Sequence, residues 1–202
     1  MQKIDLQDNQ SLKKVFWTVL VINIVLFAIE LGYGIVSHSN ALLADSLDNL
    51  SDAFVYGISL FVVSRGMTAK ANASLVKGGV MALLGFFVIG EAVYKILHPA
   101  IPVAEVMTMV GMVAIIANAT CLWLLTRHKH ADLNARSAWA CSLNDVIGNV
   151  SVIVASFLVT YFHSMWPDVL ISLMLATIVL HSSVGVIREA LAHRNPVCGK
   201  EW

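Results

Sequence analysis

The chain has 202 residues, of which 58% are hydrophobic and only 13% are charged, and its mean hydropathy is +0.77. A soluble domain of this size exposes too much surface to hide so many apolar side chains, so the composition excludes a soluble enzyme, a nucleic-acid binder and a disordered chain. The formal net charge is zero and the three cysteines are odd in number, so the sequence indicates neither a polyanionic partner nor a disulfide framework. We therefore expect an integral membrane protein.

Six apolar runs follow one another along the sequence, each close to the length of about 20 residues that a helix needs to cross a bilayer. They lie at about Val15–Val36, Ala41–Ser64, Gly78–Leu97, Val103–Leu125, Ser137–Phe162 and Val169–Leu191. The sequence thus predicts an all-α membrane protein with one transmembrane domain over residues 1–202. We expect a short N-terminal segment (about 1–13), six spans (about 14–191) and a short tail (about 192–202).

The basic residues predict the orientation of these spans. Of the 13 Lys and Arg residues, all but Lys95 precede the first run, lie between the second and third or the fourth and fifth runs, or close the sixth. An excess of Lys and Arg marks cytoplasmic loops. We therefore expect both termini in the cytoplasm and a multi-pass protein of the cell membrane, namely a bacterial inner membrane.

The second run carries three carboxylates. Asp45, Asp48 and Asp52 fall within about 60° of one another on a helix of 3.6 residues per turn, and Asn49 and Tyr56 extend this polar face. An Asp near the centre of a transmembrane helix costs about 2.5–3.5 kcal/mol, so the face needs a cation, water or polar partners. A hydrogen-bonded network that only positions helices remains an alternative, and for Asp45 so does a solvated or capping role near the outer end.

The fifth run offers a matching face. Cys141 and Asp145 are four residues apart, and Asn149 continues the row one turn further. A thiolate and three carboxylates from two helices make a four-ligand set that suits Zn²⁺ and similar ions, whereas Mg²⁺ or Ca²⁺ would need more oxygens and no sulfur. A lone Cys in a helix is also a common small core residue.

These residues resemble the cation diffusion facilitator (cation efflux) family of metal exporters. The resemblance is carried by DSLDNLSD (Asp45–Asp52) and AWACSLNDVIGNV (Ala138–Val150), and by six spans with both termini inside. It implies a cation-efflux transmembrane bundle with metal ligands Asp48, Asp52 and Asp145, and Cys141 where the family usually has His. The softer thiolate should favour Zn²⁺ or Cd²⁺ over Mn²⁺. Members usually carry a C-terminal cytosolic metal-binding domain that helps them to dimerise, and for this domain the chain has no room. A homodimer through the membrane helices is an open alternative.

The function expected from this resemblance is secondary transport. Metal ligands must be deprotonated to bind, so the chain should export a divalent cation from the cytoplasm in exchange for protons. It should do so without enzymatic activity and with no cofactor beyond the transported Zn²⁺ or Cd²⁺. Its partners are then the ion, protons and membrane lipid, with no nucleic acid. The alternatives are a proton-coupled exporter of organic cations, a non-transporting metal sensor or assembly protein and, most weakly, an intramembrane enzyme.

Several further polar residues receive no assigned role. Glu30 in the first run lines the outward route or lies near the membrane surface. Glu91 and Lys95, four residues apart, predict an ordinary ion pair on one helix. Three other residues offer metal-binding side chains in a loop or tail, where they are either solvated or collect metal: His128, His130 and Cys198.

Overall fold

The computed structural model describes residues 2–62, 67–127 and 133–194, and in these ranges the chain forms six helices and no strand. The helices are α1 (Gln2–Ser37), α2 (Asn40–Val62), α3 (Met67–Leu97), α4 (Ala104–Thr126), α5 (Leu133–Phe162) and α6 (Trp166–Arg194). The predicted all-α architecture is confirmed for these residues.

Several helices are longer than the apolar runs that predict them. α1 begins at Gln2 instead of about Val15, and α3 begins at Met67 instead of about Gly78. Hydropathy marks the part of a helix that lipid can surround, whereas hydrogen bonding continues the helix through polar residues into water.

Five of the described helices are long and apolar enough to cross a membrane: α1, α3, α4, α5 and α6. α2 is not among them, because Asp45, Asp48 and Asp52 lower its hydropathy. It is nevertheless deeply buried in the bundle, and every residue from Ala41 to Leu47 is buried. A helix that carries charge is therefore surrounded by apolar ones.

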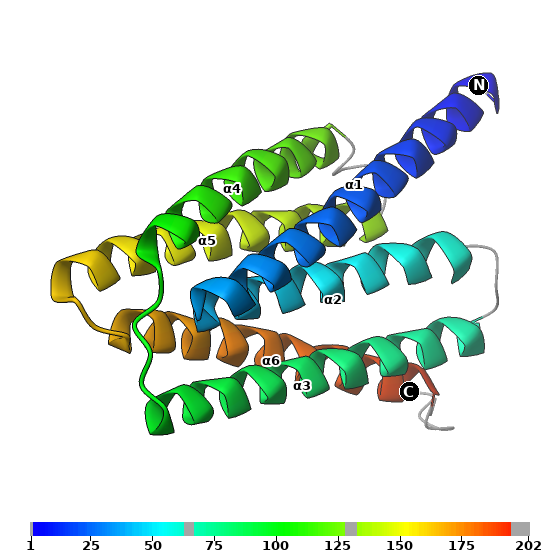
Figure 1. Ribbon diagram of the computed structural model, residues 1–202. Coiled ribbons are helices and arrows are strands. Elements are labelled where there is room, and N and C mark those ends of the chain that lie inside the picture. Colours follow the sequence, from blue (N-terminus) through cyan, green and yellow to red (C-terminus); the bar gives the residue numbers. More distant parts are fainter. Residues whose placement is uncertain (1, 63–66, 128–132, 195–202) are drawn as a thin grey trace, which may run out of the picture.

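The bundle is organised around α2 (Figure 1). The most extensive contacts join α3 to α6, α1 to α2 and α4 to α5. α2 in addition contacts α3, α5 and α6, and α1 contacts α4. The polar face of α2 therefore lies among neighbouring helices, and α5 is one of them.

A tight turn joins α1 to α2. His38 has a positive φ of 54°, the left-handed conformation that commonly ends a helix. The N–H of Ser39 donates to the carbonyl of Gly34 (2.9 Å) and the N–H of His38 donates to that of Ile35 (3.3 Å). These two bonds form a Schellman motif and turn the chain directly back into α2.

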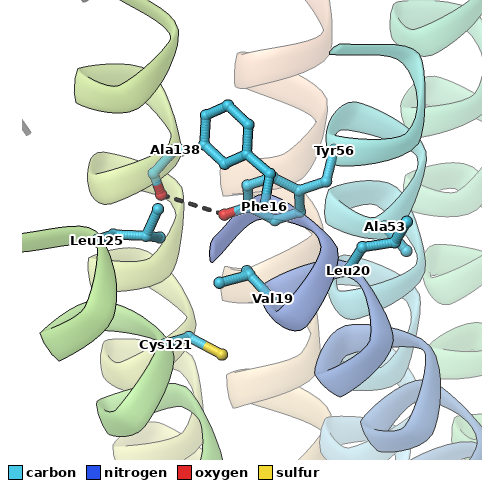
Figure 2. Packing of buried hydrophobic residues seen from close by; sticks show 8 residues of the cluster. All are labelled: Phe16, Val19, Leu20, Ala53, Tyr56, Cys121, Leu125 and Ala138. Atoms are coloured by element: carbon cyan, nitrogen blue, oxygen red, sulfur yellow. Dashed lines mark hydrogen bonds between the residues drawn. The ribbon is translucent and has the colours of Figure 1, made fainter. Parts of the chain in front are cut away.

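An apolar cluster packs around the middle of α1. Figure 2 shows Phe16, Val19 and Leu20 of α1 packed near side chains from α2, α4 and α5. Within it, the Tyr56 hydroxyl donates a hydrogen bond of 3.2 Å to the carbonyl of Ala138, drawn as a dashed line. This bond ties α2 to α5 at one end of their contact.

Candidate metal site

Two contacts fix the relation between α2 and α5. At one end Tyr56 bonds to Ala138. At the other end, a Cβ added to Gly148 would lie 2.9 Å from Asp45 Oδ1. The backbone of α5 at Gly148 therefore lies close to the Asp45 side chain of α2. The two helices are therefore antiparallel, and the facing stretches 45–56 and 138–148 have similar lengths of about 16 and 15 Å at 1.5 Å per residue.

The four residues expected to bind metal lie on these facing stretches. Asp52 and Asp145 are buried (5% and 4% exposed), and Asp48 and Cys141 are half-buried. The charges of Asp52 and Asp48 both act on Asp145. Tyr56, which is buried beside them, interacts in turn with Asp52, Cys141 and Asp145.

Metal binding by these residues stays a prediction. Among the residues that the structure describes, no group of three or more His, Cys, Asp or Glu side chains is arranged closely enough to hold a metal ion. The two helices do place these residues on facing stretches, with two acidic residues on α2 and an acidic residue and a thiol on α5.

A further carboxylate from α1 joins the polar face of α2. Glu30 is fully buried inside the bundle. Its Oε2 accepts a hydrogen bond of 2.7 Å from Asn49 Nδ2, and its carboxyl lies within hydrogen-bonding range of that of Asp45. Asp45 is only 2% exposed, which overturns a solvated role for it.

The ion pair expected along α3 is wrong. Lys95 instead reaches across to α6, where its Nζ lies 2.7 Å from Asp168 Oδ2, and both side chains are buried. Lys95 also donates to the carbonyl of His38. It does not pair along its own helix with Glu91, because a buried ammonium needs a buried anion.

Asp168 also caps the start of α2. It accepts hydrogen bonds from Ser39 Oγ (2.7 Å), the N–H of Asn40 (2.8 Å) and the N–H of Ala41 (3.1 Å). The first N–H groups of a helix have no partner within it and carry partial positive charge. Asp168 therefore joins the α1–α2 turn, the end of α3 and the start of α6, a role that sequence reasoning missed.

The histidines of the predicted metal-collecting loop, His128 and His130, lie outside the described residues, as does Cys198. Nothing in the structure bears on their roles.

Comparison with known proteins gives the family of this fold. The model of the cation efflux transmembrane domain matches residues 16–193, which contain the facing stretches of α2 and α5. Together with five helices able to cross a membrane, this match makes the chain a multi-pass membrane protein.

Three relatives illustrate the similarity. A cadmium, cobalt and zinc/H(+)-K(+) antiporter of Bacillus subtilis is 27% identical over 86% of this chain and 61% of its own length. The zinc transporter ZitB of Pectobacterium atrosepticum is 29% identical over 78% of this chain and 53% of its own, and that of Escherichia coli 23% identical over 81% and 56%. The chain thus spans between half and two thirds of the length of these relatives.

Proposed function

The chain belongs to the cation efflux family, and from this premise we propose that it exports a divalent transition-metal cation, Zn²⁺ or Cd²⁺, in exchange for protons. Relatives over most of its length are named for zinc, cadmium and proton exchange. These names describe the relatives, and the substrate and coupling of this chain are inferred from its own residues.

One observation carries the proposal: α2 and α5 face each other between the Tyr56–Ala138 bond and the Asp45–Gly148 approach. Asp48 and Asp52 lie between these contacts on α2, and Cys141 and Asp145 lie between them on α5. Buried carboxylates that repel one another are stable only with a cation or with protons. A divalent cation and protons are the two species that an antiporter exchanges.

The proposed ligands are Asp48, Asp52, Cys141 and Asp145. One thiolate and three carboxylates are four donors, the number that Zn²⁺ takes in proteins, and the thiolate suits Zn²⁺ and Cd²⁺ better than Mn²⁺. Each ligand must lose its proton to bind, so metal entry releases protons and protonation favours metal release. Exchange therefore follows from competition for the same atoms.

The orientation is part of the proposal. Lys13 and Lys14 on α1 and Arg127 after α4 lie at one end of the bundle, and Lys95 with Asp168 lies at the other. By the bias of basic residues towards the cytoplasm, both termini are cytoplasmic and the Lys95–Asp168 pair is extracytoplasmic. Rocking of helices around a site near the midplane then gives alternating access.

The test is metal flux in vesicles that contain the purified protein and an imposed proton gradient. Zn²⁺, Cd²⁺, Mn²⁺ and a lipophilic organic cation are supplied in turn, with and without a K⁺ gradient. We expect Zn²⁺ and Cd²⁺ to move against the proton gradient, and Asp52→Ala and Asp145→Ala to abolish this flux because each removes a ligand.

Glu105→Gln is the matched control, since Glu105 is an exposed acid at the start of α4, away from the site. It should transport like the unaltered protein. Unchanged metal flux in both Asp variants would reject the site, and flux of the organic cation alone would reject the substrate.

A further inference from the structure

Three polar side chains meet between α1 and α2, one turn from the proposed metal ligands. They are Glu30, Asp45 and Asn49, and each is at most 2% exposed. Asn49 Nδ2 donates to Glu30 Oε2 (2.7 Å) and to the Asp45 carbonyl (3.3 Å). The carboxyl groups of Glu30 and Asp45 lie within hydrogen-bonding range of each other. Two buried carboxylates this close are stable only when they bind protons or a cation.

Three oxygens of this cluster receive no hydrogen bond. No N–H or O–H group in the described part of the chain donates to Glu30 Oε1, Asp45 Oδ2 or Asn49 Oδ1. A single shared proton would satisfy the two carboxyl groups but leave the Asn49 oxygen alone, at the cost of an unsatisfied buried acceptor. A cation bound by both carboxylates and by the Asn49 oxygen would give each of the three a partner.

Charge favours a divalent ion. Glu30 and Asp45 together carry two negative charges when ionised, and the buried ion pair in the described part of the chain joins Lys95 to Asp168 instead. A divalent cation makes the cluster neutral, whereas a monovalent ion leaves one buried negative charge uncompensated.

The cluster continues the line of ligands towards the start of α2. Asp45 precedes Asp48 by one helical turn, about 4.5 Å along the axis. Asp48 interacts electrostatically with both Glu30 and Asp45, and Asp145 interacts more weakly with these two than with Asp52 and Asp48. The order along α2 is therefore Asp52, then Asp48, then Asp45, which lies beside Glu30 of α1.

We propose that Glu30, Asp45 and Asn49 form a second cation site, made only of oxygen ligands, which takes the transported divalent ion on the extracytoplasmic side of the first site. This inference rests on the proposed function. An oxygen-only set binds Zn²⁺ or Cd²⁺ less well than a set with a thiolate. The ion therefore leaves the second site more easily than the first, as a station on an exit route requires.

The test uses the full chain in detergent micelles and Cd²⁺ as the probe. Equilibrium dialysis at saturating Cd²⁺ should find two ions per chain, and Glu30→Gln, which keeps an oxygen for Asn49 to bond, should reduce this to one. Cadmium NMR should show two resonances, because a thiolate ligand shifts the signal strongly from that of an all-oxygen site. Glu30→Gln and Asp45→Asn should each remove the oxygen-type resonance and keep the thiolate-type one.

Matched variants separate ligand loss from misfolding. Glu91→Gln removes a half-buried acid of α3 outside the cluster and should keep both ions. In Gly148→Ala the added Cβ would lie 2.9 Å from Asp45 Oδ1 and displace it. This variant should lower the affinity for the second Cd²⁺ ion about tenfold, as disturbed ligand positioning does. Gly32→Ala, with nothing within 4 Å, should not.

The outcomes distinguish this inference from the proposed function. A single, thiolate-type resonance in the unaltered protein, or two ions retained in Glu30→Gln, would overturn the second site and leave the first intact. Loss of both ions in Asp52→Ala would mean one shared site and would also overturn it. An oxygen-type resonance alone, kept in Asp52→Ala and lost in Glu30→Gln, would support the second site while the first assignment fails.

Discussion

At the scale of single residues, the two cysteines that the structure describes have different surroundings. Cys121 is fully buried in the apolar cluster with Leu125 and Phe16 (Figure 2). Cys141 is half-buried and lies one turn from Asp145, on the stretch of α5 that faces α2. Packing alone explains Cys121, whereas Cys141 is where the proposed function needs a ligand.

Cys141→His should keep transport and change its selectivity. An imidazole still binds Zn²⁺, but it is a harder ligand than a thiolate, so the ratio of Cd²⁺ to Zn²⁺ flux should fall by about tenfold or less, the range of one substituted ligand. Competition between the two ions in vesicles measures this ratio. Cys121→Ala, the matched control, should leave the ratio unchanged, and complete loss of transport in Cys141→His would speak against a simple exchange of ligands.

The acidic face of α2 is predictable from the sequence because helical periodicity is local. Asp45, Asp48 and Asp52 recur at spacings that any helix brings to one side. The bond between Asn49 and Glu30 is not predictable in this way, since it depends on how α1 and α2 pack. A signal for it existed, however: a carboxylate deep in an apolar run requires a partner.

At the scale of elements, α3 and α6 make the most extensive helix contact of the bundle. Gly78 allows the close approach: a Cβ there would lie 2.5 Å from Ile187 Cγ1 and 3.3 Å from the Ser183 carbonyl. Ser183 Oγ also donates to the Gly78 carbonyl (2.9 Å). The hydrophobic effect does not draw helices together in lipid, so helix association depends on the close packing and hydrogen bonds that small residues allow.

Gly78→Ala should therefore destabilise the protein by about 1–3 kcal/mol, the usual cost of overpacking, because Ile187 is branched at Cβ and rotates little. Gly79→Ala is the adjacent control. A Cβ at Gly79 meets nothing within 4 Å, so this change should be neutral or stabilise the helix by up to about 1 kcal/mol. Unfolding in mixed detergent micelles measures both, and equal effects would contradict the role of Gly78 in the contact.

The number of helices follows from the sequence, but their ends do not. Apolar runs locate six helices because lipid demands about 20 apolar residues per span. α1 and α3 extend well beyond their runs at the N-terminal end, where water replaces lipid and hydropathy no longer reports the backbone. Contact between α2 and α5 also lies beyond the sequence alone, and is expected only from the resemblance to a family and from the need of buried charges for partners.

At the scale of the whole molecule, one buried ion pair connects three parts of the chain. Asp168 at the start of α6 bonds to the α1–α2 turn and to Lys95 at the end of α3. The sequence offered two hints: Lys95 is the one basic residue that breaks the topological bias, and Asp168 follows Pro167 at the start of a run. Pairing them requires knowing that these ends meet.

Lys95→Met should destabilise the protein by about 3–5 kcal/mol, because it leaves the Asp168 carboxylate buried without its countercharge. Asp168→Asn should also destabilise, since it strands the ammonium of Lys95 and weakens the cap on α2. The double variant Lys95→Met with Asp168→Asn removes both charges, so its loss of stability should be smaller than the sum of the two single losses. Equilibrium unfolding in mixed detergent micelles gives the three values.

Glu91 lies one turn before Lys95 on the same helix, so Glu91→Gln tests whether loss of any charge at this end of α3 destabilises the protein. Because Lys95 pairs with Asp168 instead, this variant should change the unfolding free energy by no more than about 0.5 kcal/mol. If the single losses add fully in the double variant, or if Glu91→Gln is as harmful as Lys95→Met, then Lys95 does not stabilise the bundle through Asp168. If the losses of stability are non-additive for Lys95 and Asp168, and Glu91→Gln has no effect, then one charge pair holds the end of α3 and the start of α6 to the α1–α2 turn. Any outward opening of the bundle at that end must then either carry the three segments together or break the pair.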